Sequence, residues 1–278
     1  MNKPIVEVKG LRKLYGPGCE MCGENTGPDA GTNLCSNCGT ITALDDISFD
    51  LYSGEILGIV GESGSGKSTI VQCLYFDKEA TSGQMLLYPY DGGEKNIFDI
   101  PQNRKRYIKN HLMGMVYQNP LLGLKGYFTS GGNIAEKLLT ADTYHYGRIR
   151  QRAAELLERT EVDLPFLDRL TRTLSGGMQQ RVQISKALAN NPPLILLDEV
   201  TTGLDVSVQA KVLDLIKTIQ NELNISMIVV SHDLGVIRLL TNRTLVLKNG
   251  RIVERGLTDQ ILEDPHHRYT QLLVHSML

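Results

Sequence analysis

Residues 56–74, ILGIVGESGSGKSTIVQCL, form the stretch that decides the fold. The run 56–60 is continuously apolar, as expected of a strand that is buried on both faces of a parallel sheet. Residues 61–68 then match the pattern G-x-x-x-x-G-K-[ST], and residues 69–74 are compatible with a helix. This order predicts a phosphate-binding loop, because the loop N–H groups and the helix N-terminus both attract an anion.

The loop at residues 61–68, called the phosphate loop below, is expected to hold a nucleoside triphosphate. Lys67 is predicted to reach the β- and γ-phosphates, and the Ser68 hydroxyl to ligate Mg²⁺. The residues predicted to bind the nucleotide here are Gly61, Glu62, Ser63, Gly64, Ser65, Gly66, Lys67, Ser68 and Thr69.

Similar apolar runs lie further along the chain, at residues 194–197 and 227–230, and they predict two more buried strands. Between these runs, residues 208–219 carry apolar side chains at positions i, i+4, i+7 and i+11, which form one stripe on a helix. Buried strands that alternate with helices predict an α/β fold with a parallel sheet.

The two ends of the chain predict antiparallel strands instead. Residues 5–8 and 47–51 alternate apolar and polar side chains, as half-buried strands do. Residues 244–248 and 251–254 flank an Asn-Gly dipeptide at 249–250, which suits a two-residue hairpin turn. We therefore expect an antiparallel β-subdomain in addition to the parallel core.

The composition is that of an ordinary globular protein, with 278 residues, 41% apolar and 22% charged residues and a formal net charge of −2. These values exclude a disordered chain and a strongly basic nucleic-acid-binding protein, so no nucleic-acid partner is expected. The apolar runs are far shorter than the roughly 18 residues that span a bilayer, and the N-terminus lacks the pattern of a signal peptide. We expect a cytoplasmic protein.

Two adjacent carboxylates, Asp198 and Glu199, end the strand predicted at residues 194–197. Phosphoryl transfer depends on a bound metal ion and a positioned nucleophile. Asp198 is therefore predicted to hold Mg²⁺ through water, and Glu199 to orient and deprotonate the attacking water. A solvated acidic turn is the alternative explanation of this pair.

Residues 174–181, LSGGMQQR, add a third motif. Together with the phosphate loop and the acidic pair they resemble the ATP-binding cassette (ABC) family of P-loop ATPases over essentially the whole chain. Met178, Val182 and Ala189 fall on one face of the helix that this motif is expected to begin. Val200 departs from the family, which usually has proline after the glutamate, and a small effect is expected because valine suits an extended backbone.

The resemblance implies roles for further residues. Tyr15 resembles the aromatic residue that stacks on adenine, Gln118 the glutamine that senses the metal ion and the water, and His232 the switch histidine on the γ-phosphate. The implied catalytic residues are Glu199, His232 and Gln118, and the implied Mg²⁺ ligands are Ser68, Gln118 and Asp198. The residues that correspond to the family's dimer contacts to nucleotide are Ser175, Gly176, Gly177, Gln179 and Asp205.

The same resemblance implies an architecture and an assembly. Residues 1–278 would form a single ABC ATPase domain with a helical subdomain at residues 119–170. In this family the Ser175 turn of one subunit faces the nucleotide on Lys67 of another, which implies a head-to-tail homodimer or a heterodimer with another ABC ATPase. ATP would close this dimer and hydrolysis would open it.

Four segments narrow the resemblance: QNPLLGL at residues 118–124, SGGNI at 130–134, HYGRIR at 145–150 and DPHHRYT at 264–270. They are similar to the K-component family of the bacterial carbon–phosphorus lyase system, which implies lyase core subunits as partners and a role in phosphonate breakdown. Residues 119–134 would then contact the partner. The alternative is a dipeptide, oligopeptide or nickel importer ATPase that binds a permease at the inner membrane, although such importers usually carry an SLNP run that this chain lacks.

Four of the five cysteines follow ribbon spacing, as Cys19-x2-Cys22-x12-Cys35-x2-Cys38. This spacing predicts a four-thiolate metal site in an insert at residues 16–41, which we call the cysteine segment. Structural Zn²⁺ is the main interpretation, and the alternatives are an iron or iron–sulfur centre, disulfides, or no metal. Because residues 23–33 are too polar to form a core, metal binding is expected to supply folding free energy. The fifth cysteine, Cys73, is expected to be a small buried residue.

Overall fold

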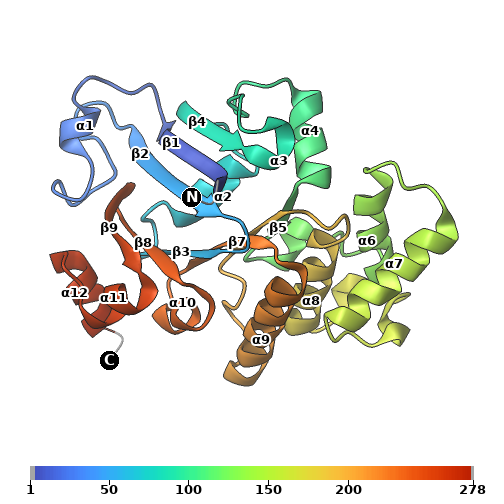
Figure 1. Ribbon diagram of the computed structural model, residues 1–278. Coiled ribbons are helices and arrows are strands. Elements are labelled where there is room, and N and C mark those ends of the chain that lie inside the picture. The colour runs from blue at the N-terminus through green and yellow to red at the C-terminus, as the bar shows by residue number, and fades with distance from the viewer. Residues whose placement is uncertain (1–3, 277–278) are drawn as a thin grey trace. The chain divides into compact units, whose positions relative to one another are not determined.

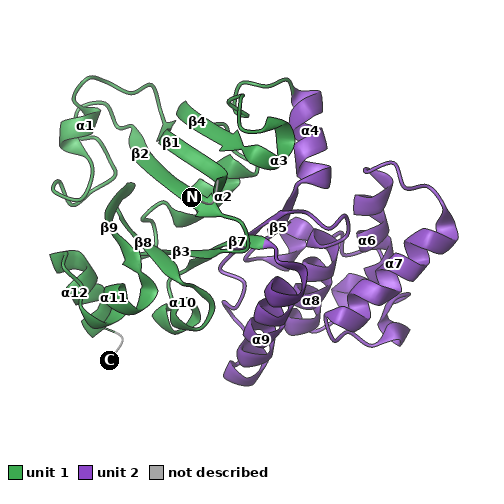
Figure 2. Cartoon of the chain, viewed as in Figure 1, with its two compact units in different colours: residues 1–101, 226–278 green, residues 102–225 purple. Residues whose placement is uncertain are grey.

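The computed structural model describes residues 4–276 and divides the chain into two compact units. Unit 1 comprises residues 1–101 and 226–278, and unit 2 comprises residues 102–225 (Figure 2). Each unit has its own strands, helices and buried apolar side chains.

Unit 1 contains a three-stranded sheet in the order β2-β1-β4 (Figure 1). Its strands are β1 (Pro4–Tyr15), β2 (Ile41–Tyr52) and β4 (Ser82–Leu87). β1 pairs antiparallel with both neighbours, with Val8 opposite Phe49 and Tyr15 opposite Ile41. The antiparallel strands predicted at residues 5–8 and 47–51 are confirmed as parts of β1 and β2. Both strands extend beyond the predicted residues.

Unit 1 also holds four strands in the order β7-β3-β8-β9. They are β3 (Ile56–Val60), β7 (Ser226–Ser231), β8 (Arg243–Lys248) and β9 (Arg251–Leu257). β3 is parallel to β7 and to β8, and every residue of β3 and β7 is buried, which confirms the prediction of strands covered on both faces. β8 and β9 form the predicted hairpin around Asn249 (φ 44°) and Gly250 (φ 77°).

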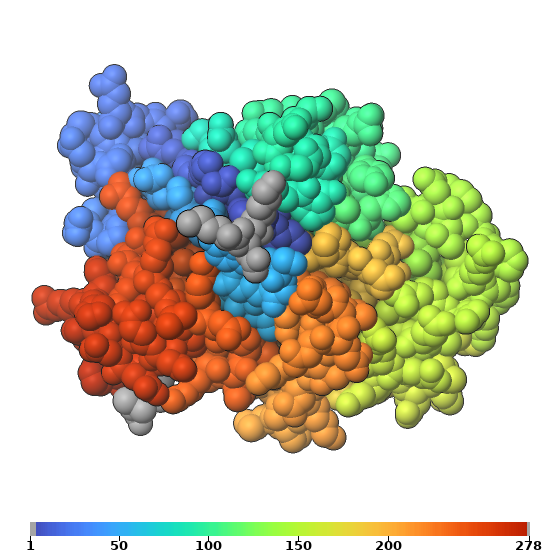
Figure 3. All heavy atoms as spheres, viewed as in Figure 1, coloured from blue at the N-terminus to red at the C-terminus, as the bar shows by residue number. Residues whose placement is uncertain are grey.

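Unit 1 contains six helices among the described residues. They are α1 (Cys22–Asn25), α2 (Lys67–Leu74), α3 (Tyr88–Asp91), α10 (Leu234–Leu240), α11 (Thr258–Glu263) and α12 (Arg268–His275). One of them, α1, is a single turn in the cysteine segment. α2 packs against β7, and α10 packs against β3 and β7. The cysteine segment joins β1 to β2 and lies at the edge of unit 1, in blue in Figure 3.

Unit 2 contains a parallel strand pair, β5 (Met113–Val116) and β6 (Leu194–Asp198). Its helices are α4 (Gln102–His111), α5 (Pro120–Gly123), α6 (Ser130–Leu139), α7 (Tyr146–Arg159), α8 (Gly176–Ala187) and α9 (Val206–Leu223), with 3-10 turns η1 (Leu164–Phe166) and η2 (Thr171–Thr173). Val212, Leu215 and Ile219 of α9 are buried, which confirms the predicted apolar stripe.

One residue of the predicted signature helix lies outside it. α8 ends at Ala187, so the prediction that Ala189 shares its helical face is wrong. The Ala189 N–H binds the Lys186 carbonyl in a tighter turn, and Asn191 follows with a left-handed φ of 48°. Two prolines come next in the sequence, and they do not continue a helix.

Residues 119–170 contain only α5, α6, α7 and η1 as regular elements, together with an isolated bridge between Thr129 and Leu170. This content agrees with the helical composition predicted there, while the limits of a helical subdomain stay a prediction. Among residues 4–276 we find no helix with the length and apolar character that a membrane span requires.

Candidate functional site

The phosphate loop leaves the buried strand β3 and enters α2 through backbone conformations that require glycine. Gly61 has a φ of 155° and Gly66 a φ of 107°. A Cβ atom at Gly66 would lie 2.5 Å from the Ala43 carbonyl oxygen, and one at Gly61 would collide with the Leu247 carbonyl oxygen. The glycines of the motif therefore allow a loop path that no other residue type can follow here.

Lys67, the first residue of α2, is buried and points back along the loop. Its Nζ donates hydrogen bonds to the carbonyl oxygens of Gly61 and Glu62, each at 2.8 Å. The amine is thus held over the loop at the N-terminus of a helix, where an anion is favoured. Ser68 and Thr69 follow it in the first turn of α2 and are half-buried.

Three segments outside the motif hold the loop through single hydrogen bonds. The Glu62 N–H donates to the Tyr269 hydroxyl of α12 (3.0 Å), and the Gly250 N–H of the β8–β9 turn donates to the Ser65 carbonyl (2.9 Å). From the cysteine segment, Asn33 Nδ2 donates to the Gly64 carbonyl (3.0 Å). The sequence analysis used the motif around Tyr269 only to narrow the family resemblance, and it missed all three contacts.

His232 and Tyr15 are the other predicted nucleotide-site residues of unit 1. His232 is exposed and follows β7, whose last residue pairs with the last residue of β3, so the phosphate loop and His232 leave adjacent parallel strands. The next residue, Asp233, accepts the Gly235 N–H (2.7 Å) and caps α10. Tyr15 ends β1 with 40% of its surface exposed, and the Lys13 Nζ lies 4.9 Å from its ring centroid.

Unit 2 brings Gln118 and Glu199 into direct contact. β5 and β6 run parallel with Val116 beside Leu197, so the residues that follow these strands emerge together. The Gln118 Nε2 donates to Glu199 Oε2 (3.0 Å), and the Thr202 hydroxyl donates to the same oxygen (3.2 Å). The predicted glutamine and the predicted base therefore form one hydrogen-bonded group.

Asp198 and Glu199 have different environments although they are adjacent. Asp198 ends β6 and is 4% exposed, whereas Glu199 is half-buried and has a left-handed φ of 46°. Such a φ is uncommon for a residue with a side chain and costs about 1 kcal/mol or more, a form of strain that clusters at functional sites. Val200, the departure from the family pattern, is 4% exposed and continues the buried layer.

Gln183 is a residue of this site that the sequence analysis missed. It lies on α8 and is 1% exposed. Its Oε1 accepts the Tyr117 N–H (2.6 Å) and its Nε2 donates to the Tyr117 carbonyl (3.1 Å). The side chain thus clamps the backbone immediately before Gln118. The sequence feature that could have indicated Gln183 is an amide side chain on the helix that the LSGG motif begins.

The predicted dimer-contact residues have local roles within unit 2. Ser175 caps α8 by accepting the Met178 N–H (3.3 Å). Gln179 Nε2 donates to the carbonyl groups of Thr171 and Leu174, each at 3.1 Å. A Cβ atom at Gly177 would lie 2.6 Å from a methyl carbon of Val208, whereas one at Gly176 would lie 3.9 Å from a methyl carbon of Leu204, an ordinary contact distance.

Asp205 caps α9 in the same way, by accepting the Val208 N–H (3.0 Å) and the Ser207 hydroxyl (2.7 Å). The Ser207 hydroxyl and the backbone N–H groups hold the pKa of Asp205 below its ordinary value. Capping explains Asp205 without a second subunit, so its predicted dimer contact stays a prediction.

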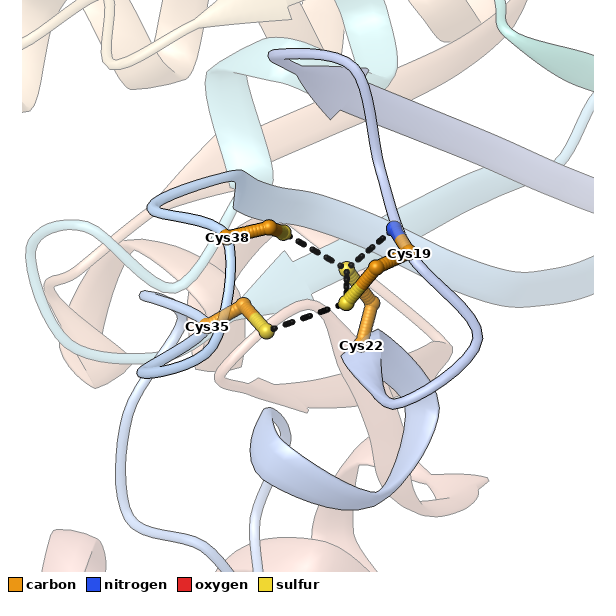
Figure 4. Close-up of side chains that lie close together, drawn as sticks. All are labelled: Cys19, Cys22, Cys35 and Cys38. Carbon is orange, nitrogen blue, oxygen red and sulfur yellow. Dashed lines mark hydrogen bonds between the residues drawn. The ribbon is translucent and has the colours of Figure 1, made fainter.

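The cysteine segment gathers its four thiols at one point (Figure 4). The sulfur atoms of Cys19, Cys22, Cys35 and Cys38 all lie within 4.8 Å of one another. The separate S···S distances along this group are 3.7, 3.7 and 3.5 Å. They are far longer than the roughly 2.05 Å of a disulfide bond, and the four cysteines are free thiols, which disfavours the disulfide alternative.

The thiol geometry fits a tetrahedral metal ion. Four sulfur atoms at about 2.3 Å from a central Zn²⁺ would lie about 3.8 Å apart, close to the separations in this cluster. Hydrogen bonds from the Thr40 side chain and backbone lower the pKa of the Cys38 thiol to about 6, and the backbone N–H groups of Cys38 and Asn37 lower the pKa of Cys35. Burial and the neighbouring thiols raise the pKa of Cys22 instead. The surroundings thus favour the metal-binding thiolate form at Cys35 and Cys38 but not at Cys22.

Cys73 lies apart from the four clustered thiols. It lies on α2, is fully buried, and burial raises its pKa to about 11. The prediction that it is a small buried residue is confirmed.

Comparisons with known proteins agree with this set of motifs. The family model described as ABC transporter matches residues 44–202. The putative phosphonates utilization ATP-binding protein PhnK of Escherichia coli (strain K12) is 42% identical over 278 residues, which cover 100% of this chain and 99% of that protein. A putative peptide import ATP-binding protein of Brucella abortus (strain 2308) is 38% identical over 239 residues, or 85% of this chain and 71% of the relative.

Solved structures lead to the same family. A dimeric bacterial ABC transporter cassette superposes with a TM-score of 0.75 and 29% identity, covering 91% of this chain and 98% of that one. A dimeric post-hydrolysis state of an ATP-binding cassette bound to ADP and Pi gives the same values. The α/β cassette fold predicted from the sequence is thus confirmed, and the chain belongs to the ABC transporter family of ATP-hydrolysing cassettes.

Proposed function

We propose that this chain is the ATP-hydrolysing subunit of a carbon–phosphorus lyase complex that acts in phosphonate breakdown. The observation that carries the proposal is the match to the phosphonates utilization protein PhnK over the full length of both chains. The peptide-import relatives are matched over a smaller share of each chain. Similarity over the whole of both chains includes the regions outside the ATPase motifs. It therefore supports membership of the same kind of complex better than similarity confined to an ATPase core would.

For ATP binding, the proposal assigns the triphosphate to residues 61–69 and the adenine to Tyr15. The donors fit an anion, because Gly64 leaves open space beside the backbone and the buried Lys67 amine lies at the N-terminus of α2. Ser68, Gln118 and Asp198 would hold Mg²⁺, which supplies charge neutralisation at the phosphates when bound.

For hydrolysis, Glu199 is the proposed general base that accepts a proton from the attacking water. Gln118 and Thr202 both donate to its Oε2, so they fix the direction of the carboxylate. Gln183 holds the strand end that carries Gln118 and is a positioning residue. His232 is assigned to the γ-phosphate, and Ser175, Gly176, Gly177, Gln179 and Asp205 to contacts across a dimer.

A substitution of the proposed base tests this assignment. Glu199→Gln should keep ATP binding, trap a nucleotide-bound dimer and lower turnover by about two orders of magnitude or more, because the amide accepts no proton. Phosphate release and size-exclusion chromatography with ATP measure the two effects. Glu158→Gln, an exposed carboxylate on α7, is the matched control. Turnover equal to that of the unmodified chain would contradict the role.

The proposed partner surface lies in residues 119–134. Leu121, Leu122, Tyr127 and Phe128 are exposed by 62, 70, 77 and 43%. Large apolar side chains gathered on a surface are typical of protein contacts. We assign this surface to the lyase core subunits.

Isolation of the complex tests the partner. A tagged copy purified from its native cells with a non-hydrolysable ATP analogue should bring down lyase core subunits, identified by mass spectrometry. Leu122→Lys should reduce that recovery. Leu257→Lys should not, although Leu257 on β9 is also an exposed leucine. Recovery of a permease with a substrate-binding protein would replace the lyase assignment by the importer that the Brucella relative's name describes.

For the cysteine segment, we propose a structural Zn²⁺ bound by Cys19, Cys22, Cys35 and Cys38. The S···S separations support a closed tetrahedral site, which has no position for a reacting water. A role in folding the segment follows, and a catalytic role of this metal does not.

A further inference from the structure

The cysteine segment reaches the phosphate loop through one side chain. Asn33 Nδ2 donates to the Gly64 carbonyl at 3.0 Å, which joins residues 31 positions apart. Gly64 has a left-handed φ of 83°, and unlike Gly61 and Gly66 it has open space where a Cβ atom would lie, so neighbouring atoms constrain it less than the other two loop glycines. A donor on its carbonyl fixes the orientation of the peptide group between Gly64 and Ser65.

The position of Asn33 is set by the cysteine knuckle itself. Its carbonyl accepts the Thr42 N–H (2.8 Å), and two residues later the Cys35 N–H donates to the Thr40 carbonyl (2.9 Å). Cys35 is one of the four clustered thiols. The side chain that touches the phosphate loop is therefore two residues from a proposed metal ligand, on a backbone that is hydrogen-bonded to the start of β2.

The residue between them, Leu34, extends an exposed apolar strip. Leu34 forms a bridge with Ile41, and Ile41 is paired with Tyr15 across β1 and β2. Residues directly opposite in antiparallel pairs present their side chains on one face. Tyr15, Ile41 and Leu34 are 40, 45 and 53% exposed, so three adjoining apolar side chains lie open on that face.

This strip begins at the residue assigned to adenine and is contiguous in sequence with the residue that binds the phosphate loop. A purine base on Tyr15 that lies across the strip would contact Ile41 and then Leu34. Apolar and aromatic surface of this kind binds a base by stacking and burial, without reading its edge.

We propose that Asn33 and Leu34 of the cysteine segment are part of the nucleotide site, Leu34 as a contact of the base and Asn33 as a positioning residue of the phosphate loop. The inference rests on the proposed binding of ATP at residues 61–69 and Tyr15. It assigns to the metal-bound insert a role in nucleotide affinity, because the knuckle places both residues.

Two ligands separate the two roles. Leu34→Ala should weaken ATP binding about threefold to tenfold and leave binding of inorganic tripolyphosphate unchanged, since only ATP carries a base. Asn33→Ala should weaken both ligands about threefold to tenfold, since it acts on the phosphate loop. Isothermal titration calorimetry measures both affinities, and the KM for ATP should rise by the same factors.

The controls keep the outcomes distinct. Leu34→Met should bind ATP nearly as the unmodified chain does, because methionine keeps the apolar contact area that alanine removes. Leu257→Ala removes another exposed leucine, on β9, and should leave ATP affinity unaltered. Metal content and thermal unfolding are recorded for each variant. A Leu34→Ala protein that binds ATP as the unmodified chain does, or that loses tripolyphosphate to the same extent, overturns the base contact. An Asn33→Ala protein with unaltered tripolyphosphate affinity overturns the positioning role.

Failure of the proposed function would look different. If the unmodified chain does not bind ATP, or if Lys67→Ala leaves ATP binding unaltered, the nucleotide site itself is wrongly assigned. If Lys67→Ala abolishes ATP binding while Leu34→Ala and Asn33→Ala have no effect, only the role of the cysteine segment is refuted.

Discussion

The phosphate loop and the cysteine segment touch each other in unit 1, but different forces hold them. The phosphate loop lies between a fully buried strand and a helix. The Gly250 N–H of the β8–β9 turn donates a hydrogen bond to the loop, and the loop donates one to the Tyr269 hydroxyl of α12. Within residues 16–41, all of which the structure describes, the buried apolar side chains are only Cys22 and Cys35. A segment with so little buried apolar surface depends on other sources of folding free energy.

The contrast indicates how an inserted segment can contact the phosphate loop without changing the path of the loop. Packing and glycine geometry define the path of the phosphate loop. We therefore expect the loop to adopt this path without support from the cysteine segment. The proposed metal would supply the cysteine segment with folding free energy, and the segment donates one hydrogen bond to the loop through Asn33. Damage to the loop should therefore abolish nucleotide binding, whereas damage to the segment should only weaken it.

The largest expected effect comes from Gly66→Ala in the phosphate loop. The new Cβ would lie 2.5 Å from the Ala43 carbonyl oxygen in a residue with a φ of 107°, so the loop path must change. ATP affinity should fall about 100-fold or more, as measured by calorimetry.

Gly31→Ala is the matched control from the cysteine segment. Gly31 also has a left-handed φ, 67°, but no atom lies within 4 Å of its added Cβ. We expect it to lower the free energy of unfolding by about 1 kcal/mol and to leave ATP affinity within twofold. Equal losses of ATP affinity in both variants would erase the distinction between the two regions.

A smaller effect on ATP, and a large one on metal, is expected from Cys35→Ser. The loss of one of four thiolates should remove most of the bound metal in elemental analysis, since three ligands no longer close the site. The KM for ATP should rise about threefold to tenfold through the loss of the Asn33 and Leu34 positions. Hydrogen exchange should become fast across residues 16–41 and stay slow in β3.

Cys73→Ala is the control for this cysteine. Cys73 lies on α2 and is fully buried, so its removal costs packing and should leave metal content unaltered. Full metal retention in Cys35→Ser would refute the four-ligand site, and an unaltered KM in a metal-free Cys35→Ser protein would separate the segment from nucleotide binding.

The sequence predicted what depends on local pattern. Continuous apolar runs gave the buried strands β3, β6 and β7, and the Asn-Gly dipeptide gave the β8–β9 turn. Cysteine spacing predicted the thiol cluster, because two short knuckles bring their own ligands together. In each of these cases, residues close in sequence determine the structure.

The sequence did not predict contacts between distant segments. Gln183 and Tyr117 are 66 positions apart, and Tyr269 and Glu62 are 207 positions apart. No motif encodes such pairs, since they depend on how complete elements pack. Asn33 was missed for the same reason, because a polar residue in a glycine-rich insert is ordinarily solvated.

The smallest effect is expected from Arg251→Lys, which tests whether Arg251 helps to hold the cysteine segment. Arg251 on β9 donates from Nη2 to the Gly23 carbonyl of the segment (3.0 Å) and to Asp45 Oδ2 of β2 (2.6 Å). A third bond joins Arg251 Nε to the same Asp45 oxygen (3.0 Å). A single lysine ammonium cannot reproduce all three bonds of the planar guanidinium, so at least one of them should be lost in Arg251→Lys. The free energy of unfolding should fall by about 1 kcal/mol, with metal retained and turnover within twofold.

Hydrogen exchange is the deciding measurement for Arg251→Lys, with Arg238→Lys as the control because its ion pair with Glu263 is exposed on both sides. If Arg251 and the four thiolates together hold the cysteine segment, hydrogen exchange in residues 20–30 should become faster in Arg251→Lys and stay unchanged in Arg238→Lys. If both variants protect the segment as the unmodified chain does, Arg251 is not needed to fix its position. The proposed metal and the hydrogen bonds of residues 33 and 35 with the start of β2 would then hold the segment, while packing and glycine geometry hold the phosphate loop.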